Sequence, residues 1–567
     1  MNWGPTLAED GTKFRLWAPD REVVTLEIAD GDAVPMTRSA DGWFSTSASV
    51  GPNTRYRFRL SDDLAVPDPA SRAQSGGVHG WSVVVDHTYE WRTSDWIGRP
   101  WEEMVIQEVH VGTLGGFAGV ADHLWKIAAL GITAIELMPV NAFGGTRNWG
   151  YDGVLPYAPA ESYGTPDELK ALIDRAHELG LAVFLDVVYN HFGPDGNYLG
   201  AYAKGFFHAE VDTPWGGAVA VDQAPVHRYF VDNALMWLNE YKFDGLRFDA
   251  VHAIENDDFL DAMAAELRAK TAGRHIHLVL ENEGNDADRL HASGYDAQWN
   301  DDFHNVLHVL LTGETSAYYA DFADRPADRL ARCLGEGFIY QGEGSPNHDG
   351  KPRGKPSAHL SPTAFVAFLQ NHDQIGNRAL GERLTLLADR QKLRAATALL
   401  LLGPQIPLLF IGDDHGSESP FLFFTDFHDD LADAVREGRR KEFAKFAAFA
   451  DPEAREAIPD PNAHETFHRS HAHPGADATA WQDLYRNLLK IRHEQIIPRL
   501  RNAAAIGAEA IGEGAVVARW KMADRAVLTI ALNLGDEAVA FPEIEAAPTY
   551  ADGDAGQPGS IAVWLQP

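Results

Sequence analysis

The sequence is poor in cysteine, in basic residues and in uninterrupted apolar runs. Its single cysteine, Cys333, excludes an internal disulfide, which permits a reducing compartment, and we expect a cytoplasmic protein. The first residues, MNWGPTLAEDGTKF, lack the basic start and apolar run of a signal peptide. Gly403, Pro404 and Pro407 interrupt the most apolar window, 396–412, so it predicts a helix, a turn and a buried strand rather than a membrane span.

Basic residues are outnumbered by acidic ones, 48 to 82, which gives a formal net charge of −34. Such a surface repels nucleic acid and anionic membranes, so we expect neither as a partner, and we expect a neutral or cationic substrate. The sequence also shows no glycine-rich phosphate loop, no Cys/His metal spacing and no acidic loop of calcium-binding spacing. We therefore predict no metal and no organic cofactor. The oligomeric state stays open, a monomer included.

Short β-rich segments occupy both ends of the chain. TKFRLWAP, EVVTLEIA, TRYRFRL and SVVVD are separated by turn residues and predict a β-sandwich over 1–95 that resembles a carbohydrate-binding module. This domain either binds substrate or covers the next domain. AVVARWKMA, AVLTIALNL and SIAVWLQP predict an all-β domain over 504–567. Because 567 residues exceed one core, 96–503 is expected to form a separate, catalytic domain.

Apolar strands alternate with helical stretches through 96–503. The eight strand candidates lie in MVIQEVHVG, AIELMPV, AVFLDVVYNH, GLRFDAVH, IHLVLENE, DAQWND, FVAFLQNHD and PLLFIGDD. This alternation predicts a parallel sheet of the α/β class, and eight units predict a (β/α)₈ barrel with an excursion at about 192–228 after the third strand. Thr165, Pro166 and Glu168 predict the start of a helix that ends at Gly180.

Two opposite charges, Arg247 and Asp249, interrupt the apolar fourth strand candidate. Two residues apart, they share one face of a strand and can satisfy each other where an isolated ion would be costly. Glu281 and Asp373 end two further strands, and the C-terminal strand ends form the active site of a barrel. Carboxylates gathered there without metal ligands indicate acid–base and nucleophilic chemistry on a neutral substrate, as in glycoside hydrolysis.

Four segments resemble, in order and spacing, the sequence regions of the α-amylase superfamily, glycoside hydrolase family 13. They are DVVYNH (186–191), GLRFDAVHAI (245–254), LENE (280–283) and FLQNHD (368–373). The resemblance implies a retaining hydrolase in which Asp249 is the nucleophile, Glu281 the general acid/base and Asp373 the third carboxylate, holding sugar hydroxyls. Glu283 leaves an ambiguity of register, since it would point the same way as Glu281 on an ideal strand.

The resemblance also implies substrate-binding roles for ten residues around these carboxylates. They are Tyr151, His191, Arg247, His252, Asp301, Asp302, His304, His372, Gln374 and Asn377. Tyr151 matches an aromatic platform under the sugar, with loop packing as the alternative reading. His191 is alternatively a buried, hydrogen-bonded histidine. Asp186 and Asn190 match a mostly structural region.

Segments that lie outside the four regions or extend them resemble the branch of the superfamily that acts on maltooligosyltrehalose. Among them are WNDDFHNVLHVLLTGE, FLQNHDQIGNRALGERL and PFLFFTDFHDDLADAVREGRRKEF. The resemblance implies cleavage of the α-1,4 bond next to a terminal trehalose unit. Two departures bear on specificity: the loop after the first strand is short, and Asp413-Asp414 stands where two glutamates are usual. A glucan branching, debranching or maltogenic enzyme remains an alternative, as does a glucan-binding protein without catalysis.

Overall fold

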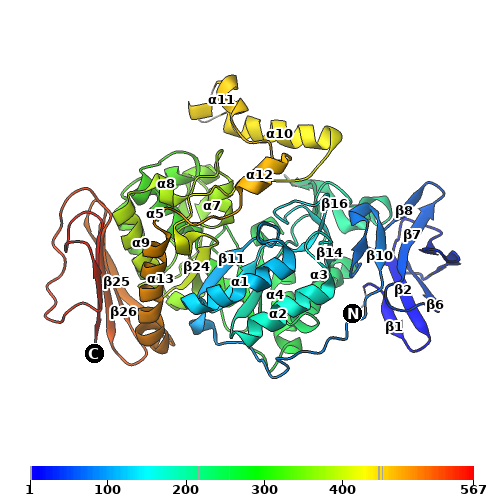
Figure 1. Cartoon of the computed structure of the whole chain (residues 1–567), viewed down its shortest axis with the longest axis horizontal. Coiled ribbons are helices and arrows are strands. Elements are labelled where there is room, and N and C mark those ends of the chain that lie inside the picture. Colours follow the sequence, from blue (N-terminus) through cyan, green and yellow to red (C-terminus); the bar gives the residue numbers. More distant parts are fainter. Residues whose placement is uncertain (1–2, 214–215, 255, 445–446, 450) are drawn as a thin grey trace.

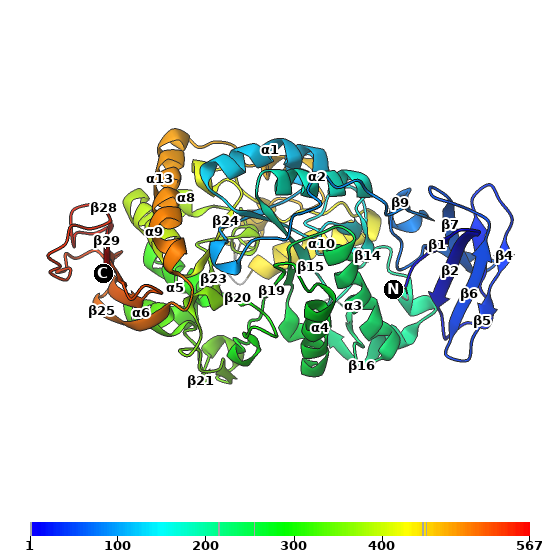
Figure 2. The same ribbon diagram turned by 90° about the horizontal axis from the view of Figure 1, so that it is seen from below.

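Three blocks lie in a row along the long axis of the molecule: N-terminal sheets, a central barrel and a C-terminal sheet (Figure 1). The computed structural model describes residues 3–213, 216–254, 256–444, 447–449 and 451–567. The view from below shows the same order of blocks (Figure 2). The predicted architecture is confirmed, whereas the predicted domain bounds of 1–95, 96–503 and 504–567 stay predictions.

Two antiparallel sheets form the N-terminal block, in the orders β1-β2-β6-β5 and β4-β3-β7-β10-β9, with β8 paired to β7. Phe14 and Tyr56, one from each sheet, pack with their ring centroids 4.7 Å apart, so the sheets face each other across an apolar core. The strands are β1 (Thr6–Ala8), β2 (Gly11–Trp17), β3 (Thr25–Ile28), β4 (Val34–Pro35), β5 (Thr37–Arg38), β6 (Trp43–Ala48), β7 (Arg55–Ser61), β8 (Leu64–Val66), β9 (Gln74–Ser75) and β10 (Trp81–Val83).

All eight predicted barrel strands form, and they close into a parallel barrel in chain order. They are β11 (Ile106–Val109), β12 (Ala134–Leu137), β15 (Ala182–Val187), β18 (Gly245–Phe248), β19 (His277–Leu280), β20 (Ala297–Trp299), β23 (Phe365–Ala367) and β24 (Ile406–Phe410). Every residue of these strands is buried, as expected of parallel strands covered by helices.

Helices follow most barrel strands and surround them (Figure 2). They are α1 (Gly116–Leu130), α2 (Pro166–Glu178), α3 (Ala224–Asn239), α4 (Asp257–Lys270), α5 (Asp301–Thr312), α6 (Pro326–Glu336), α7 (His372–Gly376), α8 (Leu384–Leu387), α9 (Arg390–Leu402) and α13 (Ala478–Ile491). The start predicted for α2 is confirmed, because Thr165 and Glu168 form a capping box around Pro166. The apolar window 396–412 folds as predicted into the end of α9, a turn and β24.

Several short elements lie outside the barrel wall. They are the hairpins β13 (Asn141–Phe143) with β14 (Gly153–Pro159), β16 (Phe207–Thr213) with β17 (Gly216–Val219), and β21 (Glu343–Gly344) with β22 (Pro352–Arg353), and the helices α10 (Asp429–Phe443), α11 (Pro452–Glu456) and α12 (His464–Arg469). The three helices stand above the barrel in Figure 1, and Arg439 of α10 donates hydrogen bonds to the carbonyls of Gly376 and Arg378. The α10 segment is thereby fastened to the end of α7.

The C-terminal block is one antiparallel sheet in the order β25-β26-β27-β29-β28. Its strands are β25 (Ala504–Gly512), β26 (Ala515–Lys521), β27 (Val527–Asn533), β28 (Tyr550–Asp552) and β29 (Ser560–Gln566). The indole of Trp520 is fully buried and donates to the carbonyl of Leu334 on α6, which joins the sheet to the barrel helices.

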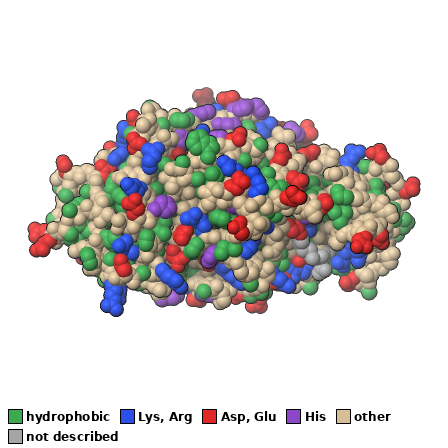
Figure 3. Space-filling model, turned by 60° about the horizontal axis from the view of Figure 1, so that its bottom comes forward, with side chains coloured by type: hydrophobic (Ala, Val, Ile, Leu, Met, Phe, Trp, Pro, Cys, Tyr) green, Lys and Arg blue, Asp and Glu red, His purple; other side chains and the backbone are tan. Residues whose placement is uncertain are grey.

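Charges of both signs are interspersed over the face shown in Figure 3, so the acidic excess of the chain is not gathered into one patch there. Among the residues that the structure describes, no helix has both the length and the apolar character needed to cross a membrane.

Candidate active site

Arg247 lies at the centre of a charge cluster at the C-terminal ends of β15, β18 and β19. Its Nη1 is 2.8 Å from Asp186 Oδ2 and 2.6 Å from Asp249 Oδ1, and its Nη2 is 3.7 Å from Glu281 Oε2. The side chain is fully buried, and its guanidinium lies 4.2 Å from the centroid of the Trp299 ring. One guanidinium thus faces three carboxylates, which explains how a buried strand accommodates charges of both signs.

Asp249 follows directly on β18 and is held from two sides. Besides its bond to Arg247, its Oδ2 accepts a hydrogen bond of 2.8 Å from Asn190 Nδ2. Burial alone would raise the pKa of Asp249, but the charges of Arg247 and His191 and the two hydrogen bonds outweigh burial and lower the pKa. Asp249 therefore stays ionised at neutral pH, as a nucleophile must.

Glu281 follows directly on β19, and its environment shifts its pKa in the opposite direction. Burial raises the pKa, and the charges of Asp249 and Asp373 add to this effect against the opposing charges of Arg247 and His252. Glu281 Oε2 lies 2.5 Å from the backbone nitrogen of Ala250. Ala250 adopts a left-handed conformation with φ 41°, a strained state typical of functional sites.

Glu283 does not point the same way as Glu281, contrary to the expectation from an ideal strand. Strand β19 ends at Leu280, so the alternation of side chains no longer applies two residues further on. The Glu283 side chain is 52% exposed and its Oε1 lies 3.1 Å from His348 Nε2. His252, predicted to bind substrate, has its ring nitrogen Nε2 3.7 Å from Glu283 Oε2.

Asp373 lies in the first turn of α7, where the side chain of Asn371 caps the helix and accepts from the backbone nitrogen of Asp373. The Asp373 side chain is 44% exposed, and Asn377 Nδ2 donates to it at 3.3 Å. Its neighbour His372 is buried, with Nδ1 at 2.5 Å from Glu108 Oε1 and Nε2 at 3.4 Å from Asp373 Oδ1.

His372 is a cation at neutral pH. Burial would lower its pKa, but the charge of Glu108, the charge of Asp373 and the hydrogen bond to Glu108 outweigh burial and raise the pKa to about 9. The site therefore contains two buried cations, Arg247 and His372, beside its carboxylates. Together they offset the mutual repulsion of the carboxylates.

Tyr151 contacts one of these cations, His372, and also Asp186, the carboxylate partner of the other. Its hydroxyl donates to Asp186 Oδ2 at 2.6 Å, and its ring stacks on His372 with centroids 5.0 Å apart and planes 22° apart. His191 Nε2 lies 2.9 Å from the carbonyl of Tyr151, and its Nδ1 contacts Asn190 Oδ1. The ring of Tyr151 is thus fixed beside the carboxylates, where a sugar platform is expected.

Asp301 lies near the active-site carboxylates Glu281 and Asp373, whereas its neighbour Asp302 has other partners. Burial and the charges of Glu281 and Asp373 raise the pKa of Asp301 well above its usual range, and Gln374 Nε2 lies 3.4 Å from its Oδ1. Asp302 is fully buried, accepts from the backbone nitrogens of Ile339 and Tyr340, and pairs with Arg353 at 3.0 Å. In this structure it anchors the chain that follows α6, and its role in substrate binding stays a prediction.

His304 is likewise a structural residue in this arrangement. It is 1% exposed, with Nδ1 at 2.6 Å from the carbonyl of Leu369 and Nε2 at 3.3 Å from the hydroxyl of Tyr319. Burial lowers its pKa to about 3, so it is neutral. Both ring nitrogens contact protein groups, and the predicted role of His304 in substrate binding stays a prediction.

Sequence reasoning missed Glu108, which pairs with His372, and placed Asn190, which donates to Asp249, only in a mostly structural region. Glu108 lies inside the apolar strand β11, the same signal that drew attention to Arg247 in β18. At the end of β24, Asp413 is bound by neighbouring side chains: it accepts a hydrogen bond from Gln370 at 2.6 Å and lies 3.5 Å from Arg383.

Among the described residues, no group of three His, Cys, Asp or Glu side chains could hold a metal ion.

The opposite pKa shifts of Asp249 and Glu281 predict a bell-shaped dependence of kcat/KM on pH. Activity needs ionised Asp249 and protonated Glu281, so it rises through the lowered pKa of the first and falls through the raised pKa of the second. Asp373→Asn removes a charge that raises the pKa of Glu281, so its alkaline limb moves to lower pH. Asp301→Asn is the matched control, because burial and the charges of Glu281 and Asp373 raise the pKa of that carboxyl and favour its neutral form. An unmoved limb in the Asp373 variant, measured on residual activity, would contradict the assignment.

Two segments of the chain match known families. Residues 72–213 match the family described as "Alpha amylase, catalytic domain", and residues 503–563 match "Domain of unknown function (DUF3459)". Across its whole length, the chain superposes on a crystal structure of a Salmonella typhimurium protein provisionally assigned as an alpha amylase. That match has a TM-score of 0.94 and 46% identity and covers 100% of this chain and 99% of the other.

Curated relatives carry one name over nearly the whole chain. Malto-oligosyltrehalose trehalohydrolase of Deinococcus radiodurans is 40% identical over 549 residues, covering 94% of this chain and 89% of the relative. The protein of the same name from Saccharolobus solfataricus is 40% identical, covering 87% of each chain. A 1,4-alpha-glucan branching enzyme from Cutibacterium acnes is 30% identical but matches only 42% of this chain and 41% of its own. This chain therefore belongs to the malto-oligosyltrehalose trehalohydrolase family of the α-amylase superfamily.

Proposed function

We propose that the protein hydrolyses the α-1,4-glucosidic bond next to the terminal trehalose unit of maltooligosyltrehalose, releasing trehalose and a shortened maltooligosaccharide. The observation that carries the chemistry is the reach of one guanidinium, Arg247, to both Asp249 and Glu281, whose pKa values shift in opposite directions. Family membership supports the choice of substrate. The lone, buried Cys333 permits the cytoplasmic location that we also propose.

In the first step, Asp249 attacks the anomeric carbon while protonated Glu281 gives its proton to the oxygen of the leaving trehalose. The bond to trehalose breaks as the glycosyl–Asp249 ester forms. Arg247 and Asn190 hold the attacking carboxylate in place, and its lowered pKa keeps it ionised. Asp373 and Asn377 are proposed to hold hydroxyls of the distorted sugar.

In the second step, Glu281, now ionised, takes a proton from water, and the resulting hydroxide displaces Asp249 from the anomeric carbon. The product keeps the α configuration after two inversions. This retaining route requires the carboxyl groups of Asp249 and Glu281 to stand about 5–5.5 Å apart, against about 6.5–9.5 Å in inverting enzymes.

A product assay tests the substrate. We expect purified protein to release free trehalose from maltooligosyltrehalose and to cleave a maltooligosaccharide of equal length only slowly, with sugars separated by chromatography. Equal cleavage of the two substrates would show a general α-glucanase without preference for the trehalose unit. New α-1,6 branches on long glucans, without trehalose, would favour the branching alternative.

A further inference from the structure

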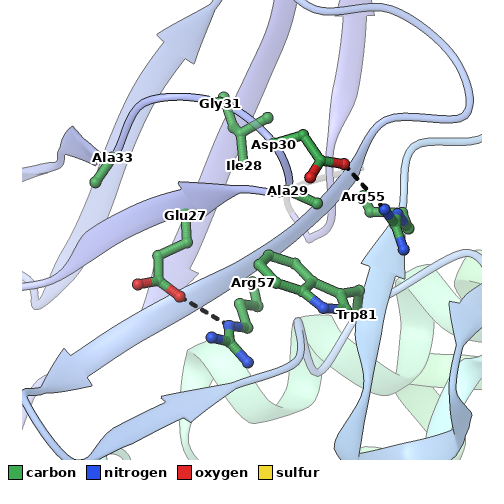
Figure 4. Close-up of a pocket in the computed structure, with 9 residues that line it drawn as sticks. All are labelled: Glu27, Ile28, Ala29, Asp30, Gly31, Ala33, Arg55, Arg57 and Trp81. Atoms are coloured by element: carbon green, nitrogen blue, oxygen red, sulfur yellow. Dashed lines mark hydrogen bonds and ion pairs between the residues drawn. The ribbon is translucent and has the colours of Figure 1, made fainter.

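A buried ion pair between Glu108 and His372 lies beside Asp373. The side chain of Glu108 is 1% exposed and that of His372 is 2% exposed. Figure 4 shows a surface pair for comparison, Arg55 with Asp30 in the N-terminal sheets, whose side chains are 46% and 90% exposed. Exposed pairs contribute little to stability, whereas a pair shielded from water forms only where its geometry is good. The role of the buried pair follows from its contacts with His372 and with the neighbours of His372.

Both carboxylate oxygens of Glu108 accept hydrogen bonds from one residue. Oε1 lies 2.5 Å from Nδ1 of the His372 ring, and Oε2 accepts from the backbone nitrogen of His372 at 3.1 Å. That nitrogen belongs to the first residue of α7, where the helix itself provides no acceptor. Glu108 thus fixes both the ring of His372 and the start of α7, from a strand that is paired on one side with β12 and on the other with β24.

The ring of His372 faces a carboxylate at each of its two nitrogens. Nδ1 meets Glu108, and Nε2 lies 3.4 Å from Asp373 Oδ1. A neutral imidazole has a single N–H and can donate to only one carboxylate, whereas the protonated ring donates to both. Burial lowers the pKa of His372, but the charges of Glu108 and Asp373 outweigh burial and raise the pKa to about 9, in agreement with the protonated ring.

Other titratable or charged side chains face His372 from the surrounding elements. They are Asp373 of α7, Arg247 of β18, Asp186 of β15, Glu136 of β12, His110 after β11 and Tyr151, whose ring stacks on His372. Arg247 opposes a charge on His372, and burial lowers the pKa of His110 to about 4, so His110 is neutral at neutral pH. The side chain of Asp373 is 44% exposed, so water screens its charge more than that of Glu108. Glu108 is therefore the group that decides the charge of His372.

We propose that Glu108 is a positioning residue of the active site, which keeps His372 charged and oriented so that His372 in turn fixes Asp373 and the ring of Tyr151. Asp373 depends on this support, because its other side-chain partner, Asn377, donates only at 3.3 Å. The Tyr151 ring depends on it through the stack on His372, with centroids 5.0 Å apart. The role of Asp373 in holding the distorted sugar belongs to the proposed function, on which this positioning role rests.

Glu108→Gln and Glu108→Asp test the positioning role, because the first keeps the length of the side chain and the second keeps its charge. In Glu108→Gln the pKa of His372 falls from about 9, so the ring is neutral at neutral pH and donates to one partner only. We expect kcat to fall about 10- to 150-fold, the worth of one charge-assisted hydrogen bond, with little change in KM. The loss is expected to be smaller at acid pH, where His372 takes up its proton without Glu108.

Glu108→Asp is expected to lose less activity than Glu108→Gln, because the carboxylate keeps His372 charged. A role in packing alone predicts the reverse order, since Gln fills the space of Glu and Asp leaves a gap. Glu136→Gln is the matched control. Glu136 stands opposite Glu108 in the register of β11 and β12 and is fully buried, and burial and nearby carboxylates raise its pKa and favour its neutral form. The same amide substitution there changes little charge, so we expect the pKa of His372 to stay at about 9.

Nuclear magnetic resonance of the histidine rings measures the charge of His372 without substrate, with the His372 signal assigned by its absence in His372→Asn. A ring that titrates near its ordinary pKa in the unaltered protein, or that keeps a pKa of about 9 in Glu108→Gln, would overturn the proposal. Higher activity of Glu108→Gln than of Glu108→Asp would do the same. Where Glu108→Gln does not fold, the unaltered protein and Glu108→Asp keep the test, because His372 must stay charged in both.

Failure of the positioning role and failure of the proposed function are separable. The titration of His372 needs no substrate. The order of the two Glu108 variants can be measured on a maltooligosaccharide if maltooligosyltrehalose releases no trehalose.

Discussion

Asp249→Asn is expected to lower kcat for trehalose release by roughly 10⁴–10⁶-fold, the scale seen when a catalytic nucleophile is removed. The amide has nearly the shape of the carboxylate but cannot form the glycosyl ester. Arg247 keeps Asp186 and Glu281 as partners, so the fold and substrate binding are expected to persist. The measurement combines single-turnover kinetics with calorimetry of maltooligosyltrehalose binding.

Asp301→Asn is the matched control for this variant, since it makes the same atomic change in the same group of carboxylates. Burial and neighbouring carboxylates raise the pKa of Asp301 and favour its neutral form, and its Oδ1 lies 3.4 Å from Gln374 Nε2. We therefore expect a loss of about tenfold at most, the worth of one hydrogen bond. Asp249→Gly with added azide distinguishes nucleophile from bystander. Azide attacks from the side that Asp249 occupied and gives a β-glycosyl azide, and failure to form that product alongside near-normal activity in Asp249→Asn would sink the assignment.

The strands and the positions of the carboxylates could be predicted because both depend on local sequence. Apolar runs of strand length are followed by acids, and in a parallel barrel all C-terminal strand ends meet at one rim. The partner of His372 could not be predicted in this way. Glu108 lies 264 residues away along the chain and meets His372 only because β11 and β24 close the barrel.

Two neighbouring residues that were predicted to share one role have different surroundings in the structure, because helix geometry turns their side chains in different directions. Asp301 and Asp302 are adjacent in the sequence, but α5 begins at Asp301 and successive helical side chains point about 100° apart. One therefore faces Glu281 and Asp373, while the other faces Ile339 and the chain behind α5. A sequence motif alone does not tell which of two adjacent residues faces the active site.

Glu281→Gln is expected to lower kcat on maltooligosyltrehalose by about 10²–10⁴-fold, the usual contribution of a general acid. The same variant is expected to keep a fast first step on an α-glycosyl fluoride, because fluoride departs without being protonated. Its pH profile should also lose the alkaline limb, since the group that titrates there is gone.

Glu283→Gln decides between the two glutamates of LENE. Because Glu283 is 52% exposed and pairs with His348 rather than with Arg247, we expect kcat and the pH profile to stay close to those of the unaltered protein. If Glu283→Gln lost the activity and Glu281→Gln kept it, the acid would stand two residues further along the chain. The position of Glu281 Oε2, 3.7 Å from Arg247 Nη2 and 2.5 Å from the nitrogen of Ala250, argues against that outcome, because it places the carboxyl beside the nucleophile that it must serve.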